Sequence, residues 1–265
     1  MDFTNIFIGL LQILRFDFNK FVEIYNSITI EYTWVVFLIF TFLCVILFFK
    51  LFGLIGLYVY TAVAIIAANI QVLKLVKFSF FEDPIALGTI LFASTFLCTD
   101  ILAEEYGAKE ARKNILIGFS SFLLMTFFML FTLGFKPIDD LSVGQEYQWA
   151  FQTQENLLGI FLPFPIFFIS SMLAYLVSQY FDVWFFQKIS NITKKKFLWF
   201  RNNLSTMISS LIDNTVFSIF AWIILNPNPL EFSTVLFTFI LGTYFLRLFI
   251  ALIDTPFIYL AKFIK

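Results

Sequence analysis

Seven apolar segments spread over the whole chain limit what this sequence can fold into. They run at about 34–50, 54–76, 84–106, 112–134, 160–187, 203–225 and 232–263. Most approach or exceed the roughly 20 residues that a helix needs to cross a bilayer. Only 13% of the residues are charged, whereas soluble domains carry about 25%. The sequence therefore predicts an all-α, multi-pass membrane protein.

The N-terminal part of the chain forms a section of its own. Residues 3–14 are apolar but too short to span a bilayer, and together with the more polar stretch that follows they look like an amphipathic surface helix or a loosely ordered arm. The first long apolar segment is separated from the next only by Lys50 and a glycine pair that begins at Gly53. We therefore divide the chain into 1–53, an arm with an amphipathic segment and an additional transmembrane helix, and 54–265, a core of six helices.

Basic residues predict which way the helices cross the membrane. With seven spans and a cytoplasmic C-terminus, most of the 17 Lys and Arg residues fall on the inner side, as the positive-inside rule requires. The N-terminus then lies outside. If residues 34–50 do not span the membrane, the other helices keep their orientation and the N-terminus lies inside.

The composition also narrows the chemistry. A net charge of −1 gives no basis for binding nucleic acid, and the chain has no histidine to ligate a metal or transfer a proton. Cys44 and Cys98 both lie in apolar segments, so a disulfide framework is not expected. The sequence contains no phosphate-binding glycine loop, so ATP would have to act through a partner. We expect no cofactor.

Acidic and polar side chains interrupt the apolar segments and are the candidate functional groups. Asp100 and Glu104 lie one helical turn apart and therefore share a helix face. A carboxylate inside a membrane costs about 2.5 to 3.5 kcal/mol on insertion scales and is by default a functional candidate. The further candidates in this polar layer are Asn69, Asp182, Asp213 and Arg247.

Each of these residues also has a purely structural interpretation. Asp182 could anchor a helix end near Lys188, and Arg247 could form an ion pair with Asp213 or Asp254. Acidic groups and an arginine from several helices must in either case turn toward a shared interior, where they pair or line a wet cavity. Such a cavity suits a flat substrate, uncharged or weakly cationic, with many hydrogen-bonding groups.

Four blocks of the sequence resemble one family in the same order. They are Asn69 followed by TDILAEEYG (99–107) and Ala111-Arg112, then SQYFDVWFFQKI (178–189), NNLSTMISSLIDNTVFSIFAW (202–222) and TYFLRLFIALIDTPFIYL (243–260). On these blocks the chain resembles the queuosine precursor transporter family, vitamin-uptake-like proteins that carry 7-deazaguanine bases. Residues 1–53 extend beyond the family pattern.

The resemblance implies an importer in the bacterial inner membrane for preQ0, preQ1 or queuine, the precursors of queuosine in tRNA. It implies six core helices, similar to the substrate-binding subunits of energy-coupling-factor importers. It also implies a non-enzymatic protein whose partners are a purine-like base and the lipid bilayer. The residues carried over as base ligands are Asn69, Asp100, Glu104, Asp182, Asp213 and Arg247.

Three alternatives remain open from the sequence. The chain could be a binding subunit that needs a separate ATPase module, or a membrane assembly protein with no small ligand. It could also be an intramembrane aspartyl protease that uses Asp182 and Asp213, although Asp213 lacks the preceding Gly-x-Gly of such enzymes. A homo-oligomer or an energising partner is neither predicted nor excluded.

Overall fold

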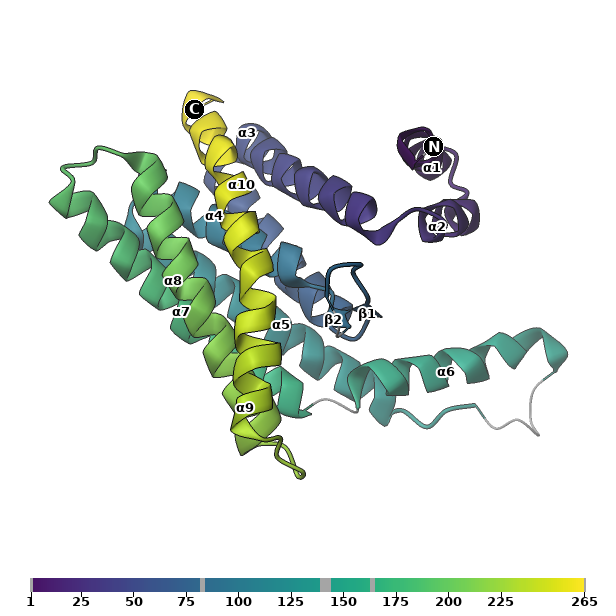
Figure 1. Ribbon diagram of the computed structural model, residues 1–265. Coiled ribbons are helices and arrows are strands. Elements are labelled where there is room, and N and C mark those ends of the chain that lie inside the picture. The colour runs from purple at the N-terminus through teal and green to yellow at the C-terminus, as the bar shows by residue number, and fades with distance from the viewer. Residues whose placement is uncertain (1, 82–83, 139–143, 163–164, 265) are drawn as a thin grey trace.

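The apolar segments form long helices in a computed structural model of the chain, which describes residues 2–81, 84–138, 144–162 and 165–264 (Figure 1). Five of the described helical stretches are long and apolar enough to cross a membrane. They are Ile30–Gln71, Ala108–Gly134, Ile166–Ile192, Leu198–Ile224 and Phe232–Ile264. The prediction of an all-α, multi-pass membrane protein is confirmed.

Helices account for nearly all of the regular structure. They are α1 (Asp2–Leu14), α2 (Phe18–Asn26), α3 (Ile30–Gln71), α4 (Thr89–Glu105), α5 (Ala108–Gly134), α6 (Gln148–Phe161), α7 (Pro165–Ile192), α8 (Leu198–Ile219), α9 (Phe232–Thr234) and α10 (Thr243–Ile264). Two short strands, β1 (Leu75–Val76) and β2 (Ile85–Ala86), and a 3-10 turn at Gln145–Tyr147 lie between helices. The backbone winds as a π-helix at Phe220–Ile224 and at Val235–Gly242.

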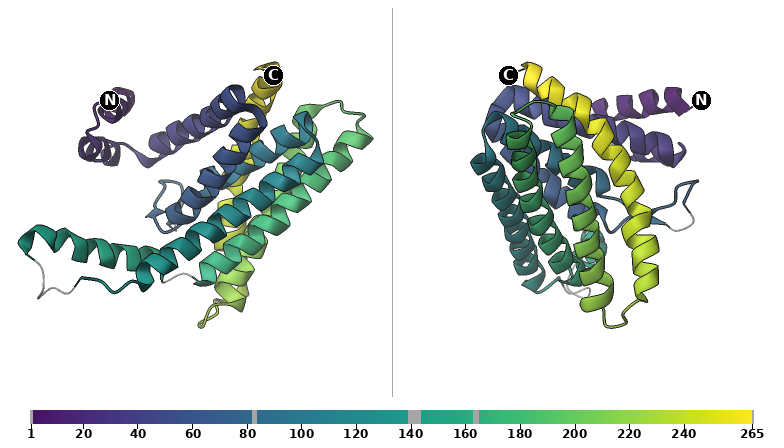
Figure 2. Two further views of the ribbon diagram at one scale, coloured as in Figure 1. Left: turned by 180° about the vertical axis from the view of Figure 1, so that it is seen from behind. Right: turned by 60° about the vertical axis from the view of Figure 1, so that its left-hand side comes forward.

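A glycine bends α3 into two helical halves. Gly53 has φ 57° and ψ −133°, a conformation that residues with a Cβ rarely adopt. The halves fold back on one another, so that the Tyr60 hydroxyl donates to the Thr41 carbonyl at 3.5 Å and the Phe48 and Tyr60 rings lie 6.2 Å apart (Figure 2). The bend falls where the sequence separates its first two apolar segments. The half that precedes it packs on α10 through the ring of Phe42.

The second and third apolar segments are shorter as helices than the sequence predicts. α3 ends at Gln71 and α4 begins only at Thr89, and between them β1 and β2 pair as an antiparallel ribbon. Gly88 precedes α4 with φ 102°, and a Cβ at this position would lie 2.7 Å from the Ala68 carbonyl oxygen. The second predicted span is therefore too long at its C-terminal end and the third at its N-terminal end. The chain turns between them, and Gly88 allows it to pass close to Ala68.

The N-terminal stretch forms two short helices, α1 and α2, which pack on each other and not within the bundle (Figure 1). A Cβ at Gly9 would lie 2.6 Å from the ring of Tyr25, so the two short helices are in close contact. Phe7 and Leu14 of α1 are largely exposed. α1 and α2 together thus present apolar surface outside the bundle.

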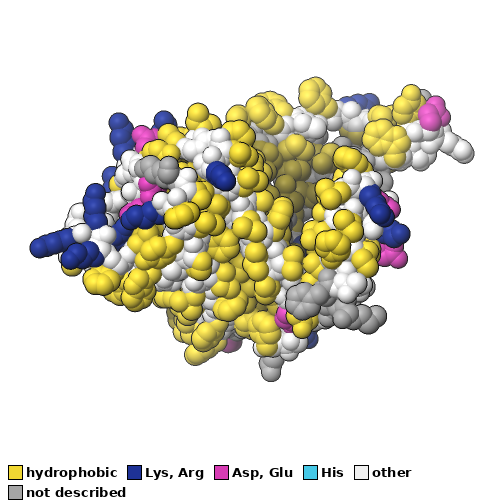
Figure 3. Space-filling model, turned by 90° about the horizontal axis from the view of Figure 1, so that it is seen from above, with side chains coloured by type: hydrophobic (Ala, Val, Ile, Leu, Met, Phe, Trp, Pro, Cys, Tyr) yellow, Lys and Arg dark blue, Asp and Glu magenta, His cyan; other side chains and the backbone are white. Residues whose placement is uncertain are grey.

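The long helices form a bundle whose basic side chains gather at one end. The α3 bend, the α4–α5 and α7–α8 turns and the C-terminus lie at this end (Figure 1 and Figure 2). Figure 3 shows Lys and Arg side chains over it, and Lys194, Lys195 and Lys196 of the α7–α8 turn are exposed. Basic residues that the orientation prediction places on the inner side thus share one end of the bundle.

Replacing Gly56 by alanine should destabilise the protein, because the added Cβ would lie 2.1 Å from the Phe48 carbonyl oxygen and force the halves of α3 apart. We expect a loss of about 1–3 kcal/mol, as is typical of an overpacked site, measured as a lower thermal midpoint in detergent. Gly159→Ala in α6 is the matched control, since no atom lies within 4 Å of a Cβ there. Equal midpoints for the two variants would contradict the close packing.

Candidate functional site

A large cavity opens between α3, α5, α7, α8 and α10, toward the end of the bundle that carries β1 and β2. Its volume is about 1140 Å3, and most of its lining is apolar or aromatic. A few polar side chains from several helices reach it, which is the usual composition of a small-molecule site. Among them are Asn69, Ser171, Asp213, Asn214, Thr243 and Arg247.

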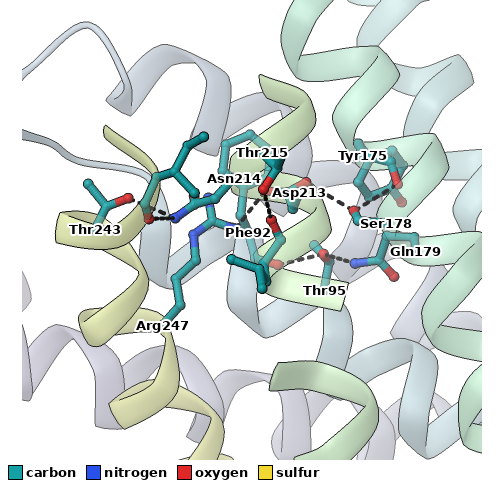
Figure 4. A network of polar contacts seen from close by, with 12 residues as sticks. Phe92, Thr95, Tyr175, Ser178, Gln179, Asp213, Asn214, Thr215, Thr243 and Arg247 are labelled. Carbon is teal, nitrogen blue, oxygen red and sulfur yellow. Dashed lines mark hydrogen bonds and ion pairs between the residues drawn. The ribbon is translucent and has the colours of Figure 1, made fainter. Parts of the chain in front are cut away.

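An ion pair at the cavity joins α8 to α10. Nη1 of Arg247 lies 2.5 Å from Oδ2 of Asp213, with the two side chains 13% and 12% exposed. Ser178 of α7 donates to Oδ1 of Asp213 at 3.0 Å, so both carboxylate oxygens are bound (Figure 4). Nε of Arg247 has no partner in the part of the chain that the structure describes. The sequence allows Arg247 to pair with Asp213 or Asp254, and in the structure it pairs with Asp213.

Two asparagines add amide groups to the cavity wall. Ser171 donates to Oδ1 of Asn69 at 2.7 Å, and Nδ2 of Asn69 donates to a carbonyl of its own helix at 2.8 Å. Nδ2 of Asn214 donates to Thr243 at 2.8 Å and to the Ile240 carbonyl at 3.1 Å. Ile240 belongs to the π-helical stretch, so Asn214 binds a carbonyl where the helix winding is irregular.

Aromatic side chains form one side of the cavity, and the sequence did not predict their place there. The rings of Trp222 and Phe239 stack at 4.7 Å, and Phe167 lies edge-on to Trp222 at 5.2 Å. Nε1 of Trp222 is buried and has no partner among the described residues. No sequence signal singles these residues out, because the chain contains 41 Phe and 5 Trp.

A second polar cluster lies behind the cavity and is fully enclosed by the bundle. It contains Asp100 of α4, Asp182 of α7 and Asp254 of α10, which are 0%, 0% and 1% exposed. In the described part of the chain, each of the three accepts a hydrogen bond from a side chain of α8. Thr206 donates to Asp100 at 3.2 Å, Ser209 to Asp182 at 2.5 Å and Asn202 to Asp254 at 2.6 Å.

Glu104 belongs to a third group, at the basic end of the bundle. Its carboxylate pairs with Arg201 of α8 and, at 3.2 Å, with Nζ of Lys262 of α10. Arg201 is fully buried, with its guanidinium 5.3 Å from the ring centre of Phe186. Glu104 therefore ties α4, α8 and α10 together one turn beyond Asp100.

The six predicted site residues thus separate into three groups. Asn69, Asp213 and Arg247 line the cavity. Asp100 and Asp182 lie in the enclosed cluster behind it, and Glu104 lies at the basic end. The shared helix face of Asp100 and Glu104 is real, but the two carboxyl groups meet different partners.

The part of the chain that carries these residues matches a described family. Residues 86–261 match the family whose description is "Putative vitamin uptake transporter". The chain is also 36% identical over 231 residues to a Bacillus subtilis (strain 168) protein named "Probable queuosine precursor transporter", which covers 86% of this chain and 93% of that protein. The chain belongs to the vitamin uptake transporter family. No solved structure matches it significantly.

Membership of the vitamin uptake transporter family confirms the resemblance of the four sequence blocks. The chain is a multi-pass membrane protein of a transporter family, and its cavity is the candidate transport site. The geometry also gives no support to an aspartyl protease. Asp213 is bound by Arg247 and Ser178, whereas Asp182 is bound by Ser209, so these two carboxyl groups have separate partners.

Removing one charge of the Asp213–Arg247 pair should destabilise this transporter more than removing both. Asp213→Asn leaves Arg247 without a counter-charge and should cost about 1.5–3 kcal/mol, a typical value for a hydrogen bond to a charged group. The double variant Asp213→Asn/Arg247→Gln should recover most of this loss. Thermal midpoints of the wild type, both single variants and the double variant give the coupling energy. Additive losses would show that the two residues do not interact.

Proposed function

We propose that the protein imports 7-deazaguanine bases, the queuosine precursors preQ0, preQ1 or queuine, across the bacterial inner membrane. The observation that carries this proposal is the 36% identity, over 86% of the chain, to the Bacillus subtilis protein named as a probable queuosine precursor transporter. The cavity supports it, because a flat base needs aromatic surface and a few hydrogen-bonding groups, and the lining supplies both.

In this proposal the base binds through an edge that carries donors and an acceptor. A guanine-like edge offers ring N–H and amino groups to carboxylate and amide oxygens, and a carbonyl oxygen to a guanidinium. Asp213 and Asn69 supply the acceptors, and Arg247 supplies the donor. The rings of Trp222 and Phe167 offer surface against which a base can stack. We assign base binding to these residues, since the other three predicted ligands do not line the cavity.

Import requires the cavity to open alternately to the two sides of the membrane. With a cytoplasmic C-terminus, the basic end faces inward and the cavity faces outward, which is the arrangement that an outward-facing state requires. Glu104, bound by Arg201 and Lys262, then closes the inner end. Separation of α4 from α8 and α10 at these ion pairs would open the opposite side.

Cells that lack both queuosine synthesis and import provide the test of this function. Expression of the protein should restore saturable uptake of radiolabelled queuine or preQ1, and excess guanine should not abolish that uptake. Liposomes that contain only the purified protein address the need for a separate ATPase module, because uptake in cells but not in liposomes would favour such a partner. No uptake of either base, with the protein present in the membrane, would contradict the assigned substrate.

Ser171→Ala should weaken base binding, whereas Ser170→Ala should not. Ser171 lines the cavity and donates to Asn69, while the adjacent Ser170 donates to the Ile166 carbonyl of its own helix at 2.7 Å. We expect Kd to rise roughly threefold to tenfold for Ser171→Ala, which is the loss of one hydrogen bond. Titration of the purified variants with queuine measures this difference. The same Kd for both variants would place Ser171 outside the binding site.

A further inference from the structure

Three buried carboxyl groups behind the cavity lack a cationic partner. No Lys or Arg in the described part of the chain forms an ion pair with Asp100, Asp182 or Asp254. Their donors on α8 are two hydroxyl groups and one amide, all of them neutral. Burial of an ionised carboxylate without a counter-charge costs several kcal/mol, and three neighbouring negative charges would also repel each other. Protons are the simplest means of neutralising such a cluster.

Two carboxyl oxygens in the cluster lack a hydrogen-bond donor. Oδ1 of Asp100 and Oδ2 of Asp182 are buried, and nothing among the described residues donates to them. The two carboxyl groups nevertheless lie within hydrogen-bonding reach of each other. Ionised carboxylates only accept hydrogen bonds, so two of them in contact leave both oxygens unsatisfied. A proton on either carboxyl group would turn one of its oxygens into a hydrogen-bond donor.

Two neutral neighbours could each gain a hydrogen bond from a proton in the cluster. Oδ1 of Asn202 is buried and unpartnered, while Nδ2 of the same amide donates to Asp254 at 2.6 Å. An amide that faces a carboxyl group gains a second hydrogen bond only when the carboxyl carries a proton. Ser209 contacts both Oδ1 of Asp182 and the Ser205 carbonyl, although its hydroxyl has a single proton to donate. A protonated Asp182 that donates to Ser209 would satisfy both contacts.

The charged side chains on either side of the cluster are already paired with one another. On the cavity side Asp213 pairs with Arg247, and at the basic end Glu104 pairs with Arg201 and Lys262. The charged side chains of α3 and α5 lie in the first two turns of those helices and at the α3 bend, and Lys188 of α7 is exposed. The further buried titratable groups on α4 and α7 include Cys98 and Tyr175. Among the described residues, no cation is left over to neutralise the three carboxylates.

Crossed hydrogen bonds connect the cluster to the cavity. Ser178 and Asp182 lie one turn apart on α7, and Ser209 and Asp213 lie one turn apart on α8. Ser178 donates to Asp213, and Ser209 contacts Asp182, so each helix holds the aspartate of the other. A ligand that engages Asp213 therefore acts on the same helix pair that positions Asp182. A shift of α7 against α8 would alter both sites together, which is the physical basis of coupling between them.

We propose that Asp100, Asp182 and Asp254 form a proton-binding site that couples base uptake to proton entry. This inference rests on the import function proposed above. A proton from the outer side forms an O–H bond with a carboxylate of the cluster while the base occupies the cavity. After the inner end opens, that O–H bond breaks and the proton leaves on the inner side together with the base. The proton gradient thereby drives accumulation, and no redox or group-transfer step is involved.

Liposomes that contain the purified full-length protein test this coupling directly. With a pH-sensitive dye trapped inside and equal pH on both sides, addition of queuine outside should acidify the lumen. With the outside more acidic than the lumen, radiolabelled queuine should accumulate above its outside concentration, and a protonophore should abolish the accumulation.

Asparagine variants identify the residues that carry the proton. Asp100→Asn, Asp182→Asn and Asp254→Asn keep the side-chain shape but cannot take up a proton, so lumen acidification and gradient-driven accumulation should be lost. Exchange of labelled for unlabelled queuine needs no net proton flow and should fall far less than accumulation. Asp17→Asn is the matched control, because Asp17 is an exposed N-cap outside the bundle and asparagine caps a helix equally well.

An infrared measurement separates failure of the coupling from failure of the import function. The wild-type spectrum minus that of Asp100→Asn, Asp182→Asn or Asp254→Asn, at neutral pH, should contain the C=O stretching band of a protonated carboxyl group that shifts in heavy water. This readout needs no substrate. Absence of the band from all three wild-type-minus-variant spectra would overturn the proton site whatever the protein transports.

The transport results lead to distinct conclusions. Queuine movement without a change in lumen pH, or accumulation driven by a sodium gradient instead, would overturn proton coupling and leave the import function intact. No movement of queuine or preQ1 under any gradient would overturn both, even with the infrared band present.

Discussion

Every charge buried in this bundle must be neutralised within it, because hydrocarbon supplies neither water nor counter-ions. The structure meets this requirement differently at three levels. Asp213 and Arg247 form an ion pair at the cavity, and Glu104 is held by two cations at the basic end. Between these levels, the donors that the described residues offer to the carboxyl groups are neutral. The polar residues therefore form a column through the bundle, in which the cavity is one level.

One helix organises this column. α8 carries Arg201, Ser205, Ser209 and Asp213 at intervals of four residues, so they follow one another along nearly the same face. Its side chains contact Glu104 at the basic end, the enclosed carboxyl groups next, and Arg247 at the cavity. Because α4, α7 and α10 are each bound to α8 through these contacts, a displacement of α8 is communicated to all levels at once.

The sequence was sufficient to predict the long helices and the residues that interrupt them, because hydrophobic length and helical spacing are local properties, but it did not predict α6. It also located the bend at Gly53, which the break between two apolar segments indicates. It could not show that Asp182 lies behind the cavity while Asp213 lines it, because that depends on how neighbouring helices are tilted and paired. Arg201 follows three exposed lysines and falls by sequence among the inner basic residues, yet it is fully buried. Its long side chain reaches Glu104 across the helix interface, a contact that no pattern within α8 contains.

The π-helical stretch at Val235–Gly242 has a mechanical consequence for α10. A π-helix holds an additional residue in its turn, and an α-helix advances by about 100° and 1.5 Å per residue. Rewinding this stretch as α-helix would therefore rotate and translate the remainder of α10 as a rigid rod, without breaking its backbone hydrogen bonds. Arg247 lies five residues beyond the stretch and would turn away from Asp213 in the same movement. A change between π- and α-helical winding at this stretch would therefore rotate α10 about its own axis and move Arg247, which binds α10 to α8.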